Sequence, residues 1–101
     1  MEKLKPTYDL AAIKAAIGSV EKLSITVSAY RTALGLGYDD NGIAGVINGI
    51  ERRMFVKSMT TFADHRLWQD VYYVPTGNLV LYLKFQADVV TEFRVMSFKE
   101  R

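Results

Sequence analysis

The sequence predicts an α+β domain in which N-terminal helices pack on one face of a C-terminal antiparallel sheet. Up to about residue 50, apolar residues recur at spacings of three and four, as they do along one side of a helix. After Arg53 the period changes to two, which is typical of strands buried on one face. A chain of 101 residues can bury one hydrophobic core, so we expect a single domain over residues 1–101.

Three helices are expected in the first half of the chain. The first has Thr7 as its N-cap and ends at Gly18-Ser19. Its apolar stripe consists of Leu10, Ile13, Ile17 and Val20. The β-branched residues within Leu23–Val27 predict a short strand after it.

The second helix is expected to begin at Ser28, which can cap it, and to close at Gly35 and Gly37. A third begins at Asp39 or Asp40. Its apolar face consists of Ile43, Val46, Ile47 and Ile50.

Four strands are expected to follow as an antiparallel meander. They are Met54–Met59, Trp68–Val74, Leu79–Gln86 and about Glu92–Phe98. The composition of Pro75–Asn78 predicts a turn, whereas the turn within Ala87–Thr91 cannot be typed. Alternation along the third strand places Leu79, Leu81, Leu83 and Phe85 on one face. The opposite face carries Val80, Tyr82, Lys84 and Gln86.

Composition excludes several classes of function. The chain is 50% hydrophobic and 24% charged, as in ordinary globular proteins, and it has no apolar run approaching the ~20 residues of a membrane span. With no cysteine and one histidine, we expect no metal site and no cofactor. A reducing cytoplasm fits these features. The N-terminus also lacks the apolar region of a secretory signal, which favours the same compartment. The net charge of +2 favours an anionic partner only weakly.

Chemistry-bearing side chains are concentrated in Lys57–Tyr73. This segment combines Lys, Ser, Thr, Asp, Arg, Gln and Tyr with the only His and the only Trp of the chain. Such groups can bind a phosphate, stack on a base or move a proton. The mixture of apolar and polar residues indicates a site at the rim of a core.

The same segment carries a resemblance to a known family. Its blocks are Lys57–Thr61, Asp64–His65, Trp68–Tyr72, Tyr82–Lys84 and Ser97–Glu100. In this order they resemble the motility quorum-sensing regulator (MqsR) family. Members of that family are toxins of type II toxin–antitoxin pairs, mRNA interferases with a RelE-like fold.

The resemblance implies metal-independent cleavage of mRNA at GCU-like sites. In this chemistry the ribose 2′-OH attacks its own phosphodiester and leaves 2′,3′-cyclic phosphate and 5′-OH ends. The resemblance implies Lys57, Gln69 and Tyr82 as the catalytic residues, with Lys99 near the same site as an RNA-binding residue. It also implies inhibition by an MqsA-like antitoxin, the zinc-binding partner of the pair, at an exposed sheet edge.

Two further RNA-binding residues follow from the sequence pattern. Tyr73 can stack on a base, and Lys84 shares its strand face with Tyr82. A strand pairing through the Pro75–Asn78 turn would bring either Gln69 or Tyr73 near Tyr82, and the sequence leaves the register open.

Each candidate residue also has a plainer interpretation. Lys57 could be a solvated surface lysine, and Tyr82 a sheet-surface residue. We favour structural roles for His65, as a loop-pinning group beside Asp64, and for Trp68, in the core. For the whole chain, the alternative to a ribonuclease is a non-catalytic RNA- or protein-binding domain on the same scaffold. A metal-dependent hydrolase is disfavoured by the shortage of ligands.

Overall fold

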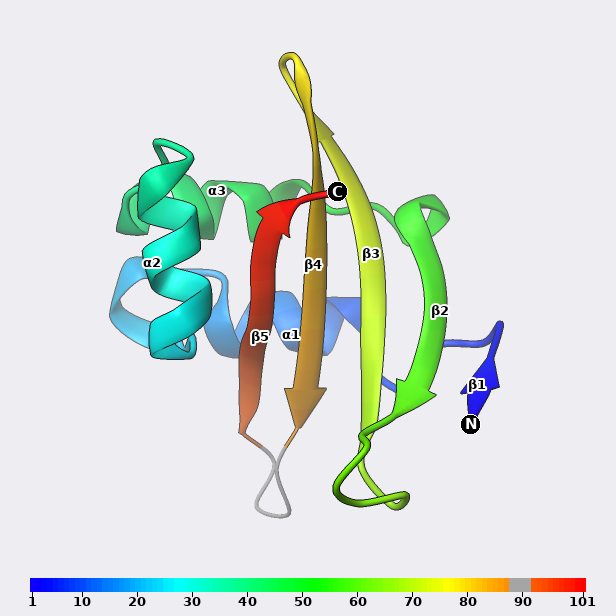
Figure 1. Cartoon of the computed structure of the whole chain (residues 1–101). Helices are drawn as coiled ribbons and strands as arrows, with labels where there is room; N and C mark the ends of the chain where they lie inside the picture. Colours follow the sequence, from blue (N-terminus) through cyan, green and yellow to red (C-terminus); the bar gives the residue numbers. More distant parts are fainter. Residues whose placement is uncertain (88–91) are drawn as a thin grey trace.

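The computed structural model describes residues 1–87 and 92–101 and contains a five-stranded antiparallel sheet (Figure 1). The strands lie in chain order: β1 (Glu2–Lys3), β2 (Phe55–Thr60), β3 (Trp68–Thr76), β4 (Leu79–Ala87) and β5 (Phe93–Glu100). The four predicted strands are therefore present in the predicted order. The two-residue β1, which pairs with Ser58 and Met59 of β2, was not predicted.

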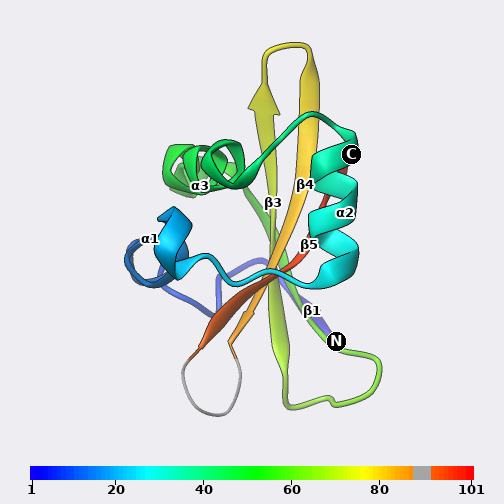
Figure 2. The same ribbon diagram turned by 90° about the vertical axis from the view of Figure 1, so that its left-hand side faces the viewer.

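The helices are α1 (Leu10–Ile17), α2 (Val27–Gly35) and α3 (Asp40–Gly49), with short 3₁₀ turns at Val20–Lys22 and Arg52–Met54. Figures 1 and 2 show α1 and α3 together behind the sheet and α2 running along its β5 edge. The predicted α+β class, with N-terminal helices on one sheet face, is thus confirmed. No helix in the described part of the chain has the length and apolar character needed to cross a membrane.

The hydrophobic core lies between the helices and one face of β3, β4 and β5. Its fully buried side chains include Ile13, Ala33, Ile43, Ile47, Ile50, Tyr72, Leu81, Leu83, Phe85, Val95 and Phe98. The leucine face predicted for the third strand is therefore the face that the helices cover. Burial of this apolar surface is the main force that fixes which sheet face stays open.

The starts of two helices differ from the predictions. Thr7 does not cap α1, because a buried carboxylate, Asp70, accepts hydrogen bonds from the Thr7 amide and holds it away from the helix. Thr26, rather than Ser28, caps α2, with its hydroxyl oxygen accepting from the Ala29 amide at 3.2 Å. Asp39 caps α3 as predicted.

The predicted strand over Leu23–Val27 is reduced to one parallel bridge between Ile25 and Val95. Leu23 and Ile25 instead pack beside the core, where the chain passes from α1 to α2, whereas Val27 is exposed. The Pro75–Asn78 turn is tighter than predicted, because Thr76 still pairs with Leu79. The Ala87–Thr91 connection lies, from residue 88 onward, outside the described residues.

Two β-bulges interrupt the register. Val56 has no partner in the pairing of β2 with β3, so Phe55 and Lys57 lie opposite the adjacent residues Tyr72 and Val71. Met96 is skipped in the same way in β5. A bulge inserts one residue without a partner and so changes which side chains reach each face.

Candidate active site

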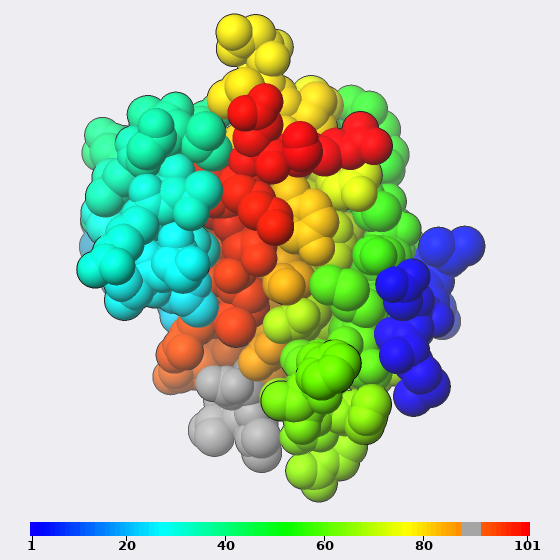
Figure 3. All heavy atoms as spheres, viewed as in Figure 1, coloured from blue at the N-terminus to red at the C-terminus, as the bar shows by residue number. Residues whose placement is uncertain are grey.

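The sheet face away from α1 and α3, called here the open face, carries most of the predicted site residues. Alternation and register place on it Lys57, Met59, Gln69, Val71, Tyr73, Tyr82, Lys84, Gln86, Ser97 and Lys99. Figure 3 shows this face uncovered between α2 and the N-terminal residues, with the C-terminal residues lying across the upper strands.

The register between β3 and β4 decides which predicted residues meet. Tyr73 pairs with Tyr82, and Gln69 pairs with Gln86. Of the two possibilities left open by the sequence, Tyr73 is therefore the direct neighbour of Tyr82. Gln69 lies four residues before Tyr73 in β3, which puts it about 13 Å from the tyrosine pair at the usual rise of a strand.

Two cations cover the tyrosine pair. The rings of Tyr73 and Tyr82 have centroids 6.0 Å apart, and the Lys99 ammonium lies 4.9 Å from the Tyr82 ring centre. The Arg101 guanidinium lies 4.4 Å from the Tyr73 ring centre. Aromatic faces attract cations at these distances, so the two side chains are held above the rings.

Lys57 stands at the β2 side of this cluster. Its Nζ lies 3.0 Å from a carboxylate oxygen of Glu2 in β1. The hydrogen bond to Glu2 raises the pKa of Lys57, so this side chain carries a positive charge throughout the neutral range. Beneath it, Val71 is fully buried although it lies on the open face, and it separates Lys57 from Lys84.

The environment shifts the pKa values of Tyr82 and Lys84 in opposite directions. Burial raises the pKa of the Tyr82 hydroxyl, and the positive charge of Lys57 partly opposes this rise. Burial, followed by repulsion from Lys99, lowers the pKa of Lys84. Tyr82 is therefore a protonated hydrogen-bond donor at neutral pH, and Lys84 loses its proton more readily than an ordinary exposed lysine.

Gln69 lies in a hollow of about 540 Å³ next to the β2–β3 loop. The hollow is lined by Met1, Met59, Thr60, Thr61, Phe62, Ala63, His65, Gln69 and Lys84. Only 8% of Gln69 is exposed, and its Nε2 donates to Gln86 Oε1 at 2.8 Å. This bond holds the Gln69 amide in place and leaves its own oxygen available as an acceptor.

The loop between β2 and β3 is held by Asp64. Its carboxylate accepts from the Arg66 amide and guanidinium, and these bonds lower the pKa of Asp64. Thr61 closes the other side of the loop through its hydroxyl. The predicted loop-pinning role of His65 is wrong for the described residues, among which His65 is exposed and makes no hydrogen bond.

Trp68 is not a core residue, contrary to the prediction. It is half-buried at the end of β3, and the Lys3 ammonium lies 4.2 Å from the centre of its ring. The reason is its position, since it precedes the part of β3 that the helices cover. Its backbone oxygen accepts a hydrogen bond from the Tyr8 hydroxyl.

Lys99 reaches the open face because of the bulge at Met96. Val95 and Phe98 are three residues apart and both buried, which a regular strand does not allow. The unpaired residue between them restores the alternation, so Lys99 pairs opposite Tyr82.

Sequence reasoning missed Glu2 and Arg101 as parts of this cluster. Arg101 was foreseeable, because a period of two places it on the same face as Lys99. Glu2 gave no signal, because a strand of two residues is too short to show a period.

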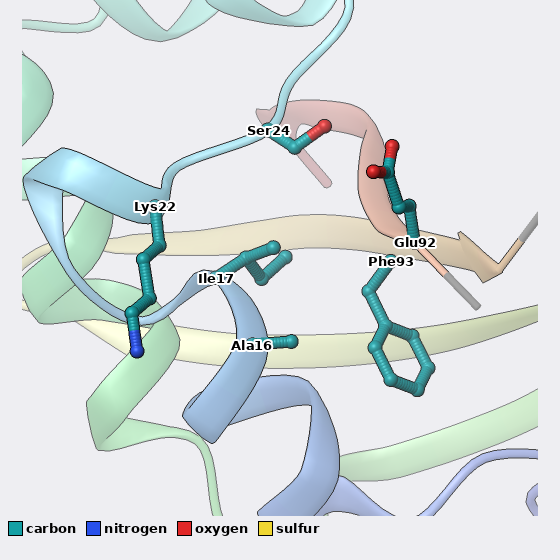
Figure 4. Close-up of a pocket in the computed structure, with 6 residues that line it drawn as sticks. All are labelled: Ala16, Ile17, Lys22, Ser24, Glu92 and Phe93. Carbon is teal, nitrogen blue, oxygen red and sulfur yellow. The ribbon is translucent and has the colours of Figure 1, made fainter. Parts of the chain in front are cut away.

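A second hollow, of about 370 Å³, lies away from the open face, between α1, the following turn and the start of β5 (Figure 4). It is lined by Ala16, Ile17, Lys22, Ser24, Glu92 and Phe93, none of which is a predicted site residue. Among residues 1–87 and 92–101, no three His, Asp or Glu side chains cluster closely enough to hold a metal ion.

Comparison with known proteins decides the family. Residues 5–100 match a family described as "Motility quorum-sensing regulator, toxin of MqsA". The chain belongs to the motility quorum-sensing regulator family. A relative of known function, the mRNA interferase toxin MqsR of Escherichia coli (strain K12), is 38% identical over 101 residues, the full length of both chains.

Membership of the motility quorum-sensing regulator family confirms the resemblance inferred from the sequence. The roles of Lys57, Gln69 and Tyr82 stay predictions. What the structure adds is their arrangement: Lys57 and Tyr82 belong to one cluster, and Gln69 lies further along β3 at the hollow.

Proposed function

We propose that this member of the family is the toxin of a type II toxin–antitoxin system and cleaves mRNA without a metal ion. The observation that carries the proposal is the Lys57–Tyr82 cluster, which joins a fixed cation to a protonated hydroxyl on a positively charged, uncovered sheet face. Attack of the ribose 2′-OH needs both kinds of group, because charge develops on the phosphate oxygens and a proton must reach the leaving oxygen. We place this activity in the cytoplasm, where mRNA occurs.

In this mechanism Lys57 neutralises charge on a non-bridging phosphate oxygen. Tyr82 donates a proton to the leaving 5′ oxygen, and its raised pKa ensures that the hydroxyl carries this proton at neutral pH. Gln69 cannot titrate, so it positions the ribose or reads the edge of a base from the hollow. Gln69 lies about 13 Å from Tyr82 along the sheet, too far to contact the same phosphate, which makes base recognition its better role.

Three further residues bind RNA in this proposal. Tyr73 offers a ring for stacking at the edge of the cluster, and Lys84 and Lys99 contact phosphates on either side of Tyr82. Positive charge is concentrated on the open face, although the whole chain has a net charge of only +2. A local patch of this kind can attract RNA even where the total charge is small.

The proposed recognition site is GCU or a close relative, and the proposed inhibitor is an MqsA-like, zinc-binding antitoxin. A free sheet edge supports the antitoxin contact. Within the described residues, β1 covers only Ser58 and Met59 of β2, which leaves the Phe55 end of that strand without a neighbour. An antitoxin strand could extend the sheet there.

One assay tests the activity and separates it from the alternative, a non-catalytic RNA- or protein-binding domain. Purified protein is incubated in EDTA with a defined RNA that contains GCU, and the 5′ ends of the products are mapped. We expect cleavage that leaves 5′-OH ends and is lost in Lys57→Ala and Tyr82→Phe, while Lys22→Ala, an exposed lysine remote from the open face, retains it. Binding without cleavage would instead support the alternative.

A further inference from the structure

The proposed reaction lacks a base. As the 2′-OH attacks, some group must take its proton. The pKa values of Lys57 and Tyr82 are both raised, so these groups stay protonated, and Gln69 cannot accept a proton at neutral pH. A carboxylate or an imidazole close to the phosphate site would be suitable.

Glu2 is the carboxylate in contact with this cluster. Its oxygen lies 3.0 Å from Lys57 Nζ, and its charge also influences the pKa of Tyr82. The side chain of Glu2 is 61% exposed, so an RNA strand on the open face can reach it. A phosphate bound by Lys57 would lie next to this carboxylate, and so would the 2′-OH that neighbours the phosphate.

The first eight residues, called here the N-terminal strap, hold Glu2 in this place. Glu2 pairs with Met59 in the sheet, and the Met1 carbonyl oxygen accepts from the Thr60 amide at 2.9 Å. At the other end of the strap, the fully buried Asp70 carboxylate accepts from the amides of Thr7 and Tyr8 at 2.9 to 3.1 Å. A buried carboxylate that binds only backbone amides of one segment fixes the course of that segment.

We propose that Glu2 is the general base of the reaction and that Asp70, by anchoring the N-terminal strap, is its positioning residue. A Glu2 oxygen takes the proton of the 2′-OH while O2′ bonds to phosphorus. The bond from phosphorus to O5′ breaks, and Tyr82 gives its proton to O5′. Glu2 then loses its proton to water and Tyr82 regains one, which returns the enzyme to its starting state. This inference rests on the proposed function.

Other groups on this face are less suited to the role. Lys84 has a lowered pKa, but Val71 separates it from Lys57. His65 lines the hollow with Gln69, and no contact joins it to Lys57 or Tyr82 among the described residues. Within the part of the chain that the structure describes, the charged and titratable groups that interact with Glu2 are Lys57 from β2 and Tyr82 from β4.

The test measures single-turnover cleavage of a GCU-containing oligonucleotide between pH 4 and 9. Affinity is measured separately with the same oligonucleotide carrying a 2′-deoxy sugar at the attacking position. We expect Glu2→Gln to slow cleavage about 100-fold or more and to abolish the fall in rate at the acidic end of this range. Affinity for the deoxy oligonucleotide should stay equal or increase, because Lys57 loses its competing carboxylate. Glu2→Asp should restore part of the rate, and Glu21→Gln, an exposed glutamate on the helical side, should behave as wild type.

A double variant tests the positioning role of Asp70. We expect Asp70→Asn to slow cleavage about tenfold in the wild-type background. In the Glu2→Gln background it should not slow cleavage further, because displacing the N-terminal strap cannot reduce the rate once the base has been removed. An equal loss in both backgrounds would show that Asp70 acts only on stability and would overturn its assignment.

Each remaining outcome is also informative. If wild type does not cleave in EDTA, the proposed function fails and this inference fails with it. If wild type cleaves and Glu2→Gln is as fast or faster, Glu2 merely competes with phosphate for Lys57, and the inference alone is overturned. A fall in rate on acidification that survives in Glu2→Gln and disappears in His65→Ala would assign the base to His65 instead.

Discussion

At the scale of single residues, the Tyr82 hydroxyl has a different task from the ring that carries it. The ring packs against Tyr73 and lies under Lys99, while the hydroxyl is the proposed proton donor. Tyr82→Phe keeps the ring, so we expect cleavage to slow about 100-fold with RNA affinity changed less than about twofold. Single-turnover rates and binding to a 2′-deoxy oligonucleotide measure the two effects.

The matched control for this variant is Tyr38→Phe, which removes a hydroxyl that bonds Thr76 outside the open face. Cleavage by Tyr38→Phe should equal that of wild type. A parallel loss of RNA affinity in Tyr82→Phe would contradict the separation of ring and hydroxyl.

Tyr72 provides a residue-scale prediction about stability. It is fully buried beside Phe55 and Phe85, and its hydroxyl has no hydrogen-bond partner within the described residues. Because a buried polar group without a partner costs free energy, we expect Tyr72→Phe to raise the free energy of unfolding by about 1 kcal/mol. Tyr38→Phe, which loses a bonded hydroxyl, should lower it by about 1 kcal/mol. Urea unfolding compares the two variants.

The same group makes the fold sensitive to alkali. Burial raises the pKa of Tyr72 from 10.0 to about 12, so the folded state favours the neutral hydroxyl. This contribution is fully present below pH 10 and is lost as the pH rises toward 12. In Tyr72→Phe the decrease in stability over this range should be smaller than in wild type.

At the scale of elements, the two bulges decide which lysines reach the open face. Lys57 and Phe55 are two residues apart, yet they lie on opposite faces because Val56 has no partner. Met96 has the same effect in β5 for Lys99.

Deleting a bulge residue should therefore be tolerated. Without Met96, regular alternation still directs Phe98 to the core and Lys99 to the open face, so we expect the free energy of unfolding to change by less than about 1 kcal/mol. Deleting Lys84 from the regular strand β4 would turn either Leu83 or Phe85 out of the core and should cost about 3 kcal/mol or more. Urea unfolding of both deletions, together with cleavage assays, checks this contrast.

The sequence predicted the helices and four strands because their apolar periods are long enough to recognise. It could not predict the bulges, because the odd spacing of Val95 and Phe98 becomes informative only once both are known to be buried. It also could not predict β1, whose position depends on a distant partner, Asp70, capturing the amides of Thr7 and Tyr8. In the same way, residue types indicated Lys57, Gln69 and Tyr82, but only the register shows that Gln69 stands apart.

At the scale of the whole molecule, charge is distributed unevenly. The net charge is +2, and Lys57, Lys84, Lys99 and Arg101 gather on or over the open face. If about three of them contact phosphates, the logarithm of the RNA-binding constant should fall with the logarithm of salt concentration with a slope of about −2. Lys99→Ala should reduce the steepness by about 0.7, whereas Lys22→Ala should leave it unchanged. A salt titration with a 2′-deoxy oligonucleotide measures these slopes, and equal slopes for the two variants would contradict the patch.

The positions of the chain ends have a practical consequence for probes and purification tags. Glu2 contacts Lys57, and Arg101 lies over Tyr73, so both ends border the open face (Figure 1). A tag attached before Met1 or after Arg101 therefore begins beside the surface where RNA is proposed to bind. The exposed turn at Gly37, between α2 and α3, is a better place for a fluorophore or an inserted peptide, since it leaves that surface uncovered.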